Sequence, residues 1–278
     1  MNSGLLPPPK TTTSDIVLRS LAFSYIGLLI LLPIIAIIFR SLESGISVLW
    51  ADMLLPPAIY SLKLTIISAF IMVLINIVTG TATAWVLVRY QFPGKSLMNA
   101  LIDVPFAMPT IVTGIMLVAV YGPRSMVGSF FNRHGIEIMF NKPGIILALL
   151  FVTFPFVVRA VQPVLIEMDK DMEEAAKTLG AGSSTIFVRV VIPSLLPAIF
   201  TGAALSFSRA LGEFGSIIMV AGNIPFKTQV ASVYIYGEIE SYNPQGALGL
   251  SIILLVFSFI TLLFLNVLQY WSRRHEKR

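Results

Sequence analysis

Long apolar runs alternate with short polar segments along this chain. The run 64–88 carries no charged residue, and comparable apolar runs fill much of 16–39, 97–121 and 246–271. A helix of about 20 apolar residues crosses a hydrocarbon core roughly 30 Å thick, so each run is long enough to span a membrane. The short alternating segments of a membrane β-barrel are not seen. The pattern therefore predicts an all-α polytopic membrane protein.

We expect six transmembrane helices. Arg159, Arg209 and Glu213 interrupt two of them, whereas the others contain long uncharged stretches. The first run is too long for the core of a signal peptide, and no small-residue cleavage site follows it, so we predict an uncleaved span. Before it, residues 1–15 are rich in Pro, Thr and Ser and predict a disordered cytoplasmic tail. The six spans are placed at about 16–39, 59–88, 97–121, 143–163, 195–222 and 246–271.

Composition supports the membrane class and narrows the chemistry. Of 278 residues, 56% are hydrophobic and only 12% are charged, against about 25% charged in soluble domains. The chain contains no cysteine, which excludes disulfides, thiolate nucleophiles and cysteine metal sites. Its two histidines, His134 and His275, lie far apart in the sequence, so we expect no histidine metal site.

Basic residues indicate the orientation. They concentrate in the N-terminal tail, around 89–95, in the loop 164–194 and at the C-terminal end, so these segments are predicted to be cytoplasmic, with both termini. The net charge of +5 is accordingly an orientation signal, and no nucleic-acid partner is expected. The predicted outer side holds fewer basic residues: Arg40, Arg124, Arg133, Lys142 and Lys227.

The cytoplasmic loop 164–194 is polar although it joins two apolar spans. Asp171 and Glu174 fit a capping box, and Gly180 fits a left-handed helix end, which predicts a helix at 172–179. Acidic residues crowd its first turn, where the helix dipole favours them. A turn at Gly182 then leads into a second helix that runs through Val191.

A two-turn helix is not stable alone in water, so something must pack against it. The side that carries Ala175, Ala176 and Leu179 is the apolar one. Its cover is either this protein's own bundle and the lipid surface, or the groove of a soluble partner. The residues alone leave both possibilities open.

This loop resembles the EAA loop of permease subunits of binding-protein-dependent ABC importers. The family pattern is Glu-Ala-Ala, three residues, Gly, nine residues, Ile, one residue and Leu-Pro. The chain matches with Glu174-Ala175-Ala176, Gly180 and Pro193, and it departs by aliphatic exchanges at Val190 and Ile192. In that family the short helix couples the permease to an ATPase subunit. The resemblance implies that ATPase docking involves Glu173, Glu174, Ala175, Ala176, Leu179 and Gly180.

Other motifs are similar to those of the T-type subunit of sulfate/thiosulfate permeases. They are the runs 105–110, 151–165, 209–216 and 221–225. The resemblance implies a type-1 ABC importer (MetI-like) core over 59–271, a second permease subunit of W type, two ATPase subunits and an external sulfate-binding protein. It also implies that ATP and magnesium bind the partner ATPase and that this chain holds no cofactor. The motif in 209–216 is shared with molybdate permeases, so a molybdate or other oxyanion permease is the alternative.

Charged residues inside the membrane are costly and are paired or face water. Arg209 and Glu213 stand four apart and can form an ion pair that orients the fifth span, or Arg209 can line an anion path. Nearby hydroxyl groups that would add donors to such a path are Ser206, Ser208 and Ser216. We interpret Lys63 and Asp103 as anchors, with Lys95 or Arg159 as the partner of Asp103.

No catalytic or nucleotide-binding motif is present. The chain lacks the Gly-x4-Gly-Lys-Ser/Thr loop that cradles phosphates, and it lacks a nucleophile elbow and a zinc-ligand helix. We therefore expect no enzymatic activity in this chain. A gradient-driven secondary transporter is the alternative from another class, although the extra first span breaks inverted symmetry. The predicted location is a bacterial inner membrane, with a plastid inner membrane as the alternative.

Overall fold

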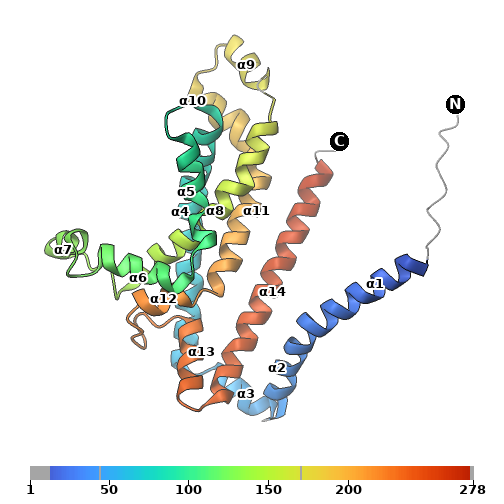
Figure 1. The fold of residues 1–278 in the computed structure, drawn as a ribbon, viewed down its shortest axis with the longest axis vertical. Helices are drawn as coiled ribbons and strands as arrows, with labels where there is room; N and C mark the ends of the chain where they lie inside the picture. Colours follow the sequence, from blue (N-terminus) through green and yellow to red (C-terminus); the bar gives the residue numbers. More distant parts are fainter. Residues whose placement is uncertain (1–12, 44, 170, 276–278) are drawn as a thin grey trace.

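The computed structural model describes residues 13–43, 45–169 and 171–275, and within them it is helical with no strand (Figure 1). Most of the predicted tail, residues 1–12, lies outside the described residues. Its last three positions were predicted wrongly, because the first helix already begins at Thr13. Asp15 supplies an acidic group in the first turn of that helix, where the dipole favours it.

The helices follow one another closely along the chain. In order they are α1 (Thr13–Ile26), the π-helical turn η1 (Gly27–Leu31), α2 (Leu32–Glu43), α3 (Ile46–Met53), α4 (Pro56–Arg89), α5 (Lys95–Ala107), α6 (Thr110–Tyr121), α7 (Met126–Arg133), α8 (Lys142–Glu167), α9 (Asp171–Thr178), α10 (Ser183–Ile186), the π-helical turn η2 (Phe187–Val191), α11 (Ile192–Leu211), α12 (Gly215–Val220), α13 (Ala231–Glu240) and α14 (Pro244–His275).

The structure confirms a polytopic helical protein. Within the described residues, five helical stretches are long and apolar enough to cross a membrane, or six if the bent pair α5–α6 is one span. Two of the predicted spans, 97–121 and 195–222, are wrong in shape. The five stretches are Ser14–Glu43, Pro56–Arg89, Lys142–Glu167, Ser183–Leu211 and Pro244–Phe264.

The predicted span 97–121 is broken rather than straight. Its two halves, α5 and α6, meet at an angle of 117°. The break falls at Met108, which is extended (φ −91°, ψ 136°) and precedes Pro109. Proline disfavours the helical conformation in the residue before it, which favours a break at Met108.

The predicted span 195–222 is wrong at both ends. The helical stretch already begins at Ser183, and α11 ends at Leu211. Gly212 follows the helix, and Glu213 then accepts hydrogen bonds from the amide and hydroxyl of Ser216. The side chain of Glu213 thus caps α12, which starts a new direction and packs against α6.

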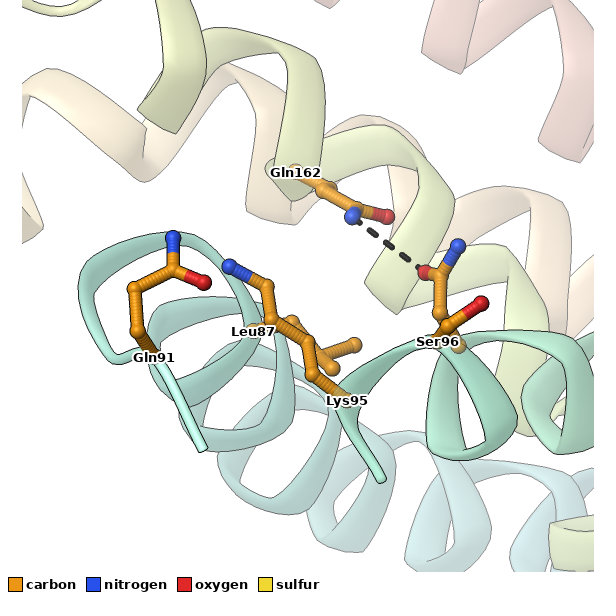
Figure 2. Close-up of a pocket in the computed structure, with 6 residues that line it drawn as sticks. Leu87, Gln91, Lys95, Ser96 and Gln162 are labelled. Carbon is orange, nitrogen blue, oxygen red and sulfur yellow. Dashed lines mark hydrogen bonds between the residues drawn. The ribbon is translucent and has the colours of Figure 1, made fainter. Parts of the chain in front are cut away.

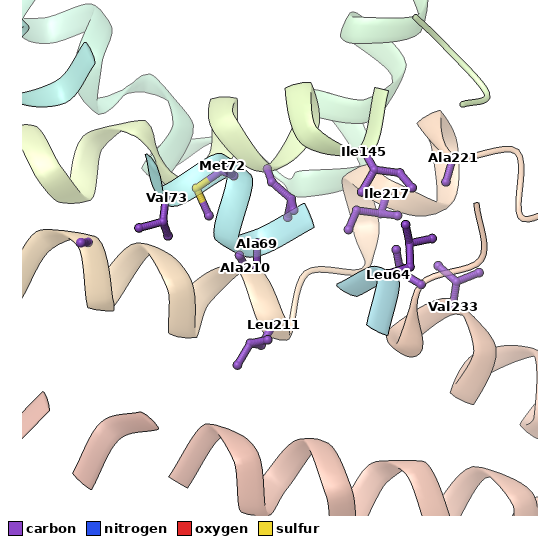
Figure 3. Packing of buried hydrophobic residues seen from close by; sticks show 13 residues of the cluster. Leu64, Ala69, Met72, Val73, Ile145, Ala210, Leu211, Ile217, Ala221 and Val233 are labelled. Atoms are coloured by element: carbon purple, nitrogen blue, oxygen red, sulfur yellow. The ribbon is translucent and has the colours of Figure 1, made fainter. Parts of the chain in front are cut away.

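The centre of the bundle is α8, packed between α4 and α11. A β-carbon on Gly80 of α4 would lie 2.8 Å from Val157 Cβ, and one on Gly202 of α11 would lie 2.7 Å from Val157 Cα. Both neighbouring helices therefore approach α8 closely at the same residue. Next to this contact, side chains from α4, α8, α11 and α12 meet in a cluster that includes Met72, Ile145 and Ile217 (Figure 3).

The N-terminal span contributes little to this core. The apolar window of Ser14–Glu43 has no buried residue, and α1 stands away from the bundle (Figure 1). Contacts with α3 and α14 are made by α2. The apolar side chains of α1 are therefore free to face lipid or another chain.

The two ends of the bundle differ in chemistry. One end carries α9 and the C-terminal end of α14, and the other carries α3 and α13 (Figure 1). At the second end, burial raises the pKa of Tyr234 to about 12, with Glu238 and Asp52 adding to the rise. The Tyr234 hydroxyl therefore stays protonated and neutral at physiological pH, beside Glu238 and Asp52.

We expect Gly202→Ala to destabilise the protein by about 1–3 kcal/mol, because the added carbon meets the backbone of α8 and the helices must separate. The measurement is the thermal unfolding midpoint of the detergent-solubilised protein. Gly27→Ala is the matched control, since nothing lies within 4 Å of the added carbon there. Equal midpoints for both variants would contradict the close α8–α11 contact.

Candidate functional site

The predicted loop helix exists as α9, within one residue of the expected bounds. Its first turn differs from the predicted capping box, because Asp169 Oδ1 accepts the amide of Asp171 at 3.0 Å. Its end matches the prediction. Gly180 has φ +82°, and the amides of Gly180 and Ala181 bond to the carbonyls of Lys177 and Ala176. These two bonds form a Schellman motif, which stops the helix sharply.

The predicted docking residues of α9 fall on two faces. Ala176 packs against a core cluster of the bundle, and Glu173 is only 14% exposed because it pairs with Arg89. Glu174, Ala175 and Leu179 are exposed, and Leu179 is 87% accessible. One face of α9 is therefore covered by its own bundle, and the other presents an acidic and apolar surface to the outside.

Arg89 joins the loop to the end of α4. Its Nη2 lies 2.5 Å from Glu173 Oε1, and its guanidinium carbon lies 5.4 Å from the centre of the Trp85 ring. Trp85 in turn meets Phe187 edge to face, with ring centres 5.0 Å apart. Both sides of the loop are thus attached to α4. Sequence reasoning missed this role of Arg89, although it is the first charge after the uncharged run 64–88.

The predicted ion pair at the end of the fifth span is confirmed. Arg209 Nη2 lies 2.7 Å from Glu213 Oε2, and the Glu213 side chain is 1% exposed against 35% for Arg209. Because Glu213 also accepts two bonds from Ser216, its buried carboxylate is well satisfied. Arg209 remains partly exposed, so the ion pair is present, while its role in orienting the span and an anion-path role both stay predictions.

The other two predicted hydroxyl residues are not brought to this carboxylate. Ser206 is buried and bonds to the carbonyl of Thr153 on α8 at 3.4 Å. The Ser208 Oγ atom is buried with no hydrogen-bond partner. Of the three serines proposed for a path, only Ser216 joins the Arg209–Glu213 pair.

A second charged group links α8 to α5. The guanidinium of Arg159 makes a two-bond contact with Asp103, through Nε to Oδ1 at 2.8 Å and Nη2 to Oδ2 at 2.6 Å. It also donates to the side-chain oxygens of Asn99 and Gln162 and to the carbonyl of Asn99. All five guanidinium hydrogens are used. Of the two predicted partners of Asp103, Arg159 is the one found.

The two broken spans meet at their breaks. A β-carbon on Gly215 would collide with Thr110 Oγ1 and the amide of Ile111, so the starts of α12 and α6 are in close contact. Arg209 and Glu213 lie directly beside this junction in the chain. Among the described residues, no group of three potential metal ligands occurs.

A bundle of bent spans that offers a capped helix at one end is the architecture of a transporter subunit. The chain belongs to the family described as "Binding-protein-dependent transport system inner membrane component", which matches residues 76–276. It is 49% identical over 219 residues to the probable sulfate transport system permease protein cysT of Chlorella vulgaris, covering 79% of this chain and 82% of that protein. It is 44% identical over 251 residues to the sulfate transport system permease protein CysT of Synechocystis, covering 90% and 88%.

Solved structures share the fold. A chain of the bacterial alginate ABC transporter in complex with a periplasmic protein aligns with a TM-score of 0.75 at 16% identity, covering 94% of this chain and 95% of that one. A chain of the MetNI methionine ABC transporter aligns with a TM-score of 0.59 at 17% identity, covering 76% and 94%. The expected type-1 ABC importer fold is thereby confirmed.

We expect Glu213→Ala to destabilise the protein by about 1–3 kcal/mol, because the amide and hydroxyl of Ser216 and the guanidinium of Arg209 lose their acceptor. Glu213→Gln keeps an oxygen for Ser216 and removes only the charge, so its effect should be smaller. Thermal unfolding of the purified protein measures both, with Glu43→Ala at an exposed position as the control. Equal stability of Glu213→Ala and the wild type would contradict the capping role.

Proposed function

We propose that this chain is the permease subunit of an ATP-driven importer that carries sulfate or thiosulfate across the membrane. The substrate class follows the names of the relatives, which are 44–49% identical over most of their length. The observation that carries the ATP-driven part is the geometry of α9, a capped helix anchored on one face and exposed on the other. Helix-in-groove docking needs such a face.

Permeases of ABC importers associate with other permease subunits and with ATPases. For this chain we propose a W-type permease partner, two ATPase subunits and an external sulfate-binding protein. The exposed face of α9 meets the ATPase, and the segments 122–142 and 223–245 at the far side meet the binding protein. In this assembly ATP and magnesium bind the ATPase, and the present chain carries no catalytic group.

The proposed mechanism uses the internal ion pairs as connections between moving parts. Closure of the ATPase pair on ATP displaces α9, and the Arg89–Glu173 pair transmits this displacement to α4. The breaks between α5 and α6 and between α11 and α12 supply the hinges at which the path opens. Such coupling requires a bundle with two states that the ATPase and the binding protein favour differently.

We place the protein in a bacterial inner membrane, with a plastid inner membrane as the alternative. Relatives are found in Synechocystis as well as in Chlorella vulgaris. The end of the bundle that carries α9 then faces the cytoplasm or the stroma, together with both termini. This orientation agrees with the concentration of basic residues at 89–95 and in the loop 164–194.

The proposal is tested by co-purifying the ATPase with this chain and its permease partner, and by measuring ATP-dependent sulfate uptake in proteoliposomes. We expect Glu174→Arg to lose the ATPase, because it reverses a charge on the exposed face of α9. Glu43→Arg makes the same exchange at an exposed position on α2 and should retain both ATPase and uptake.

Two results would contradict the proposal. Normal ATPase binding by Glu174→Arg and by a second variant, Leu179→Asp, would show that this face is not the docking surface. Uptake that persists without ATP and collapses with an ion gradient would show a secondary transporter. Competition by molybdate against labelled sulfate in the same assay distinguishes the oxyanions.

A further inference from the structure

A polar pocket lies at the α9 end of the bundle, apart from the docking face. It has a volume of about 380 Å³ and lies between the end of α4, the start of α5 and the end of α8. Figure 2 shows the polar ends of Gln91, Lys95 and Gln162 turned toward the same space. The lining residues are Leu87, Gln91, Lys95, Ser96, Asn99 and Gln162.

The charge of this pocket favours an anion. Lys95 contributes a formal positive charge, and no carboxylate is among the lining residues. The ammonium group donates one hydrogen bond to the Tyr90 carbonyl at 3.1 Å, which leaves two of its three hydrogens for a ligand. Asp103 lies one turn after Asn99, and its carboxylate is paired with Arg159.

Arg159 also determines which atoms of the two amides face the pocket. A guanidinium only donates, so the side-chain oxygens of Asn99 and Gln162 must be the atoms turned toward it, at 2.9 and 2.5 Å. Their amide nitrogens are therefore directed away from Arg159. The Gln162 nitrogen makes one long bond of 3.4 Å to Asn99 Oδ1, which leaves its second hydrogen available. The pocket thus offers the Lys95 ammonium and the amide N–H groups of Gln91 and Gln162 as donors.

We propose that this pocket is a binding site for a free oxyanion at the cytoplasmic end of the permease. Sulfate, with four acceptor oxygens and two charges, can accept hydrogen bonds from Lys95 and from the side-chain amides, while Leu87 and the side-chain carbons supply the apolar part of the lining. The choice of sulfate and the cytoplasmic side rest on the proposed function.

The test is equilibrium binding of radiolabelled sulfate to the assembled transporter in nanodiscs, without binding protein and without nucleotide. We expect a saturable component that Lys95→Met weakens about tenfold or more, since it removes a charge-assisted hydrogen bond. Lys95→Arg keeps the charge and should retain the component. Lys63→Met, at an exposed position near the start of α4, is the matched control and should bind as the wild type does.

Two outcomes would overturn the proposal. One is normal sulfate binding both by the single variant Lys95→Met and by the double variant that combines Lys95→Met with Gln91→Leu. The other is loss of the component at physiological ionic strength when anionic phosphatidylglycerol replaces zwitterionic phosphatidylcholine in the nanodiscs, because the anionic lipid headgroup would then be the occupant. ATP-driven sulfate uptake by the same variants separates the two proposals. If the wild type takes up sulfate but Lys95→Met binds it normally, only the pocket proposal is refuted. If the wild type takes up no sulfate, the proposed function is refuted.

Discussion

The pairing of charges across helices is the constraint on which the rest of this structure depends. Within the described residues there are three ion pairs, Arg89–Glu173, Arg159–Asp103 and Arg209–Glu213. The carboxylates of Glu173 and Glu213 are shielded from water, so leaving either without its arginine is costly, whereas the Asp103 side chain is half exposed. Arg89 ends α4 and Arg209 lies near the end of α11, whereas Arg159 lies inside α8 and pairs with Asp103 about one turn before the break at Met108.

The three pairs connect the parts that a transport cycle has to move. Arg89 connects the loop helix α9 to α4. Arg159 on α8 connects to Asp103 on α5, before the 117° bend between α5 and α6. Glu213 holds the start of α12 while Arg209 belongs to the end of α11. Around them, close contacts at Gly80 and Gly202 keep α4, α8 and α11 packed as one unit. The bundle therefore combines a tightly packed centre of α4, α8 and α11 with two breaks, one between α5 and α6 and the other between α11 and α12.

Sequence patterns predicted the parts of the fold that depend on local chemistry. The apolar runs predicted the straight spans, and Gly180 predicted the end of α9, because hydrophobic length and a left-handed glycine are local properties. The broken spans were missed for two reasons. Both halves of 97–121 are apolar, so hydropathy shows no gap at Met108, and the capping of α12 by Glu213 depends on a turn that only tertiary packing settles.

The candidate site was predictable to a similar depth. The loop motif predicted which residues form α9, and Asp103 was expected to pair with either Lys95 or Arg159. The choice of Arg159, the covering of Glu173 by Arg89 and the bonds of Asn99 to Arg159 and Gln162 all join residues more than 50 positions apart. No local pattern contains such contacts. They divide α9 into an anchored face and a free face, and that division is the basis of the proposed coupling.

The central claim is that α9 and the end of α4 move as one body during transport. Because the chain has no cysteine, Arg89→Cys with Glu173→Cys places a single thiol pair at this contact, which a short bifunctional reagent can link. The deciding measurement is ATP-driven sulfate uptake by the assembled transporter before and after linking. Because the double exchange removes the ion pair, the predicted result is reduced uptake before linking and recovered uptake after it. Loss of uptake on linking, restored by cleaving the linker, would show that α9 must separate from α4 and would contradict the account.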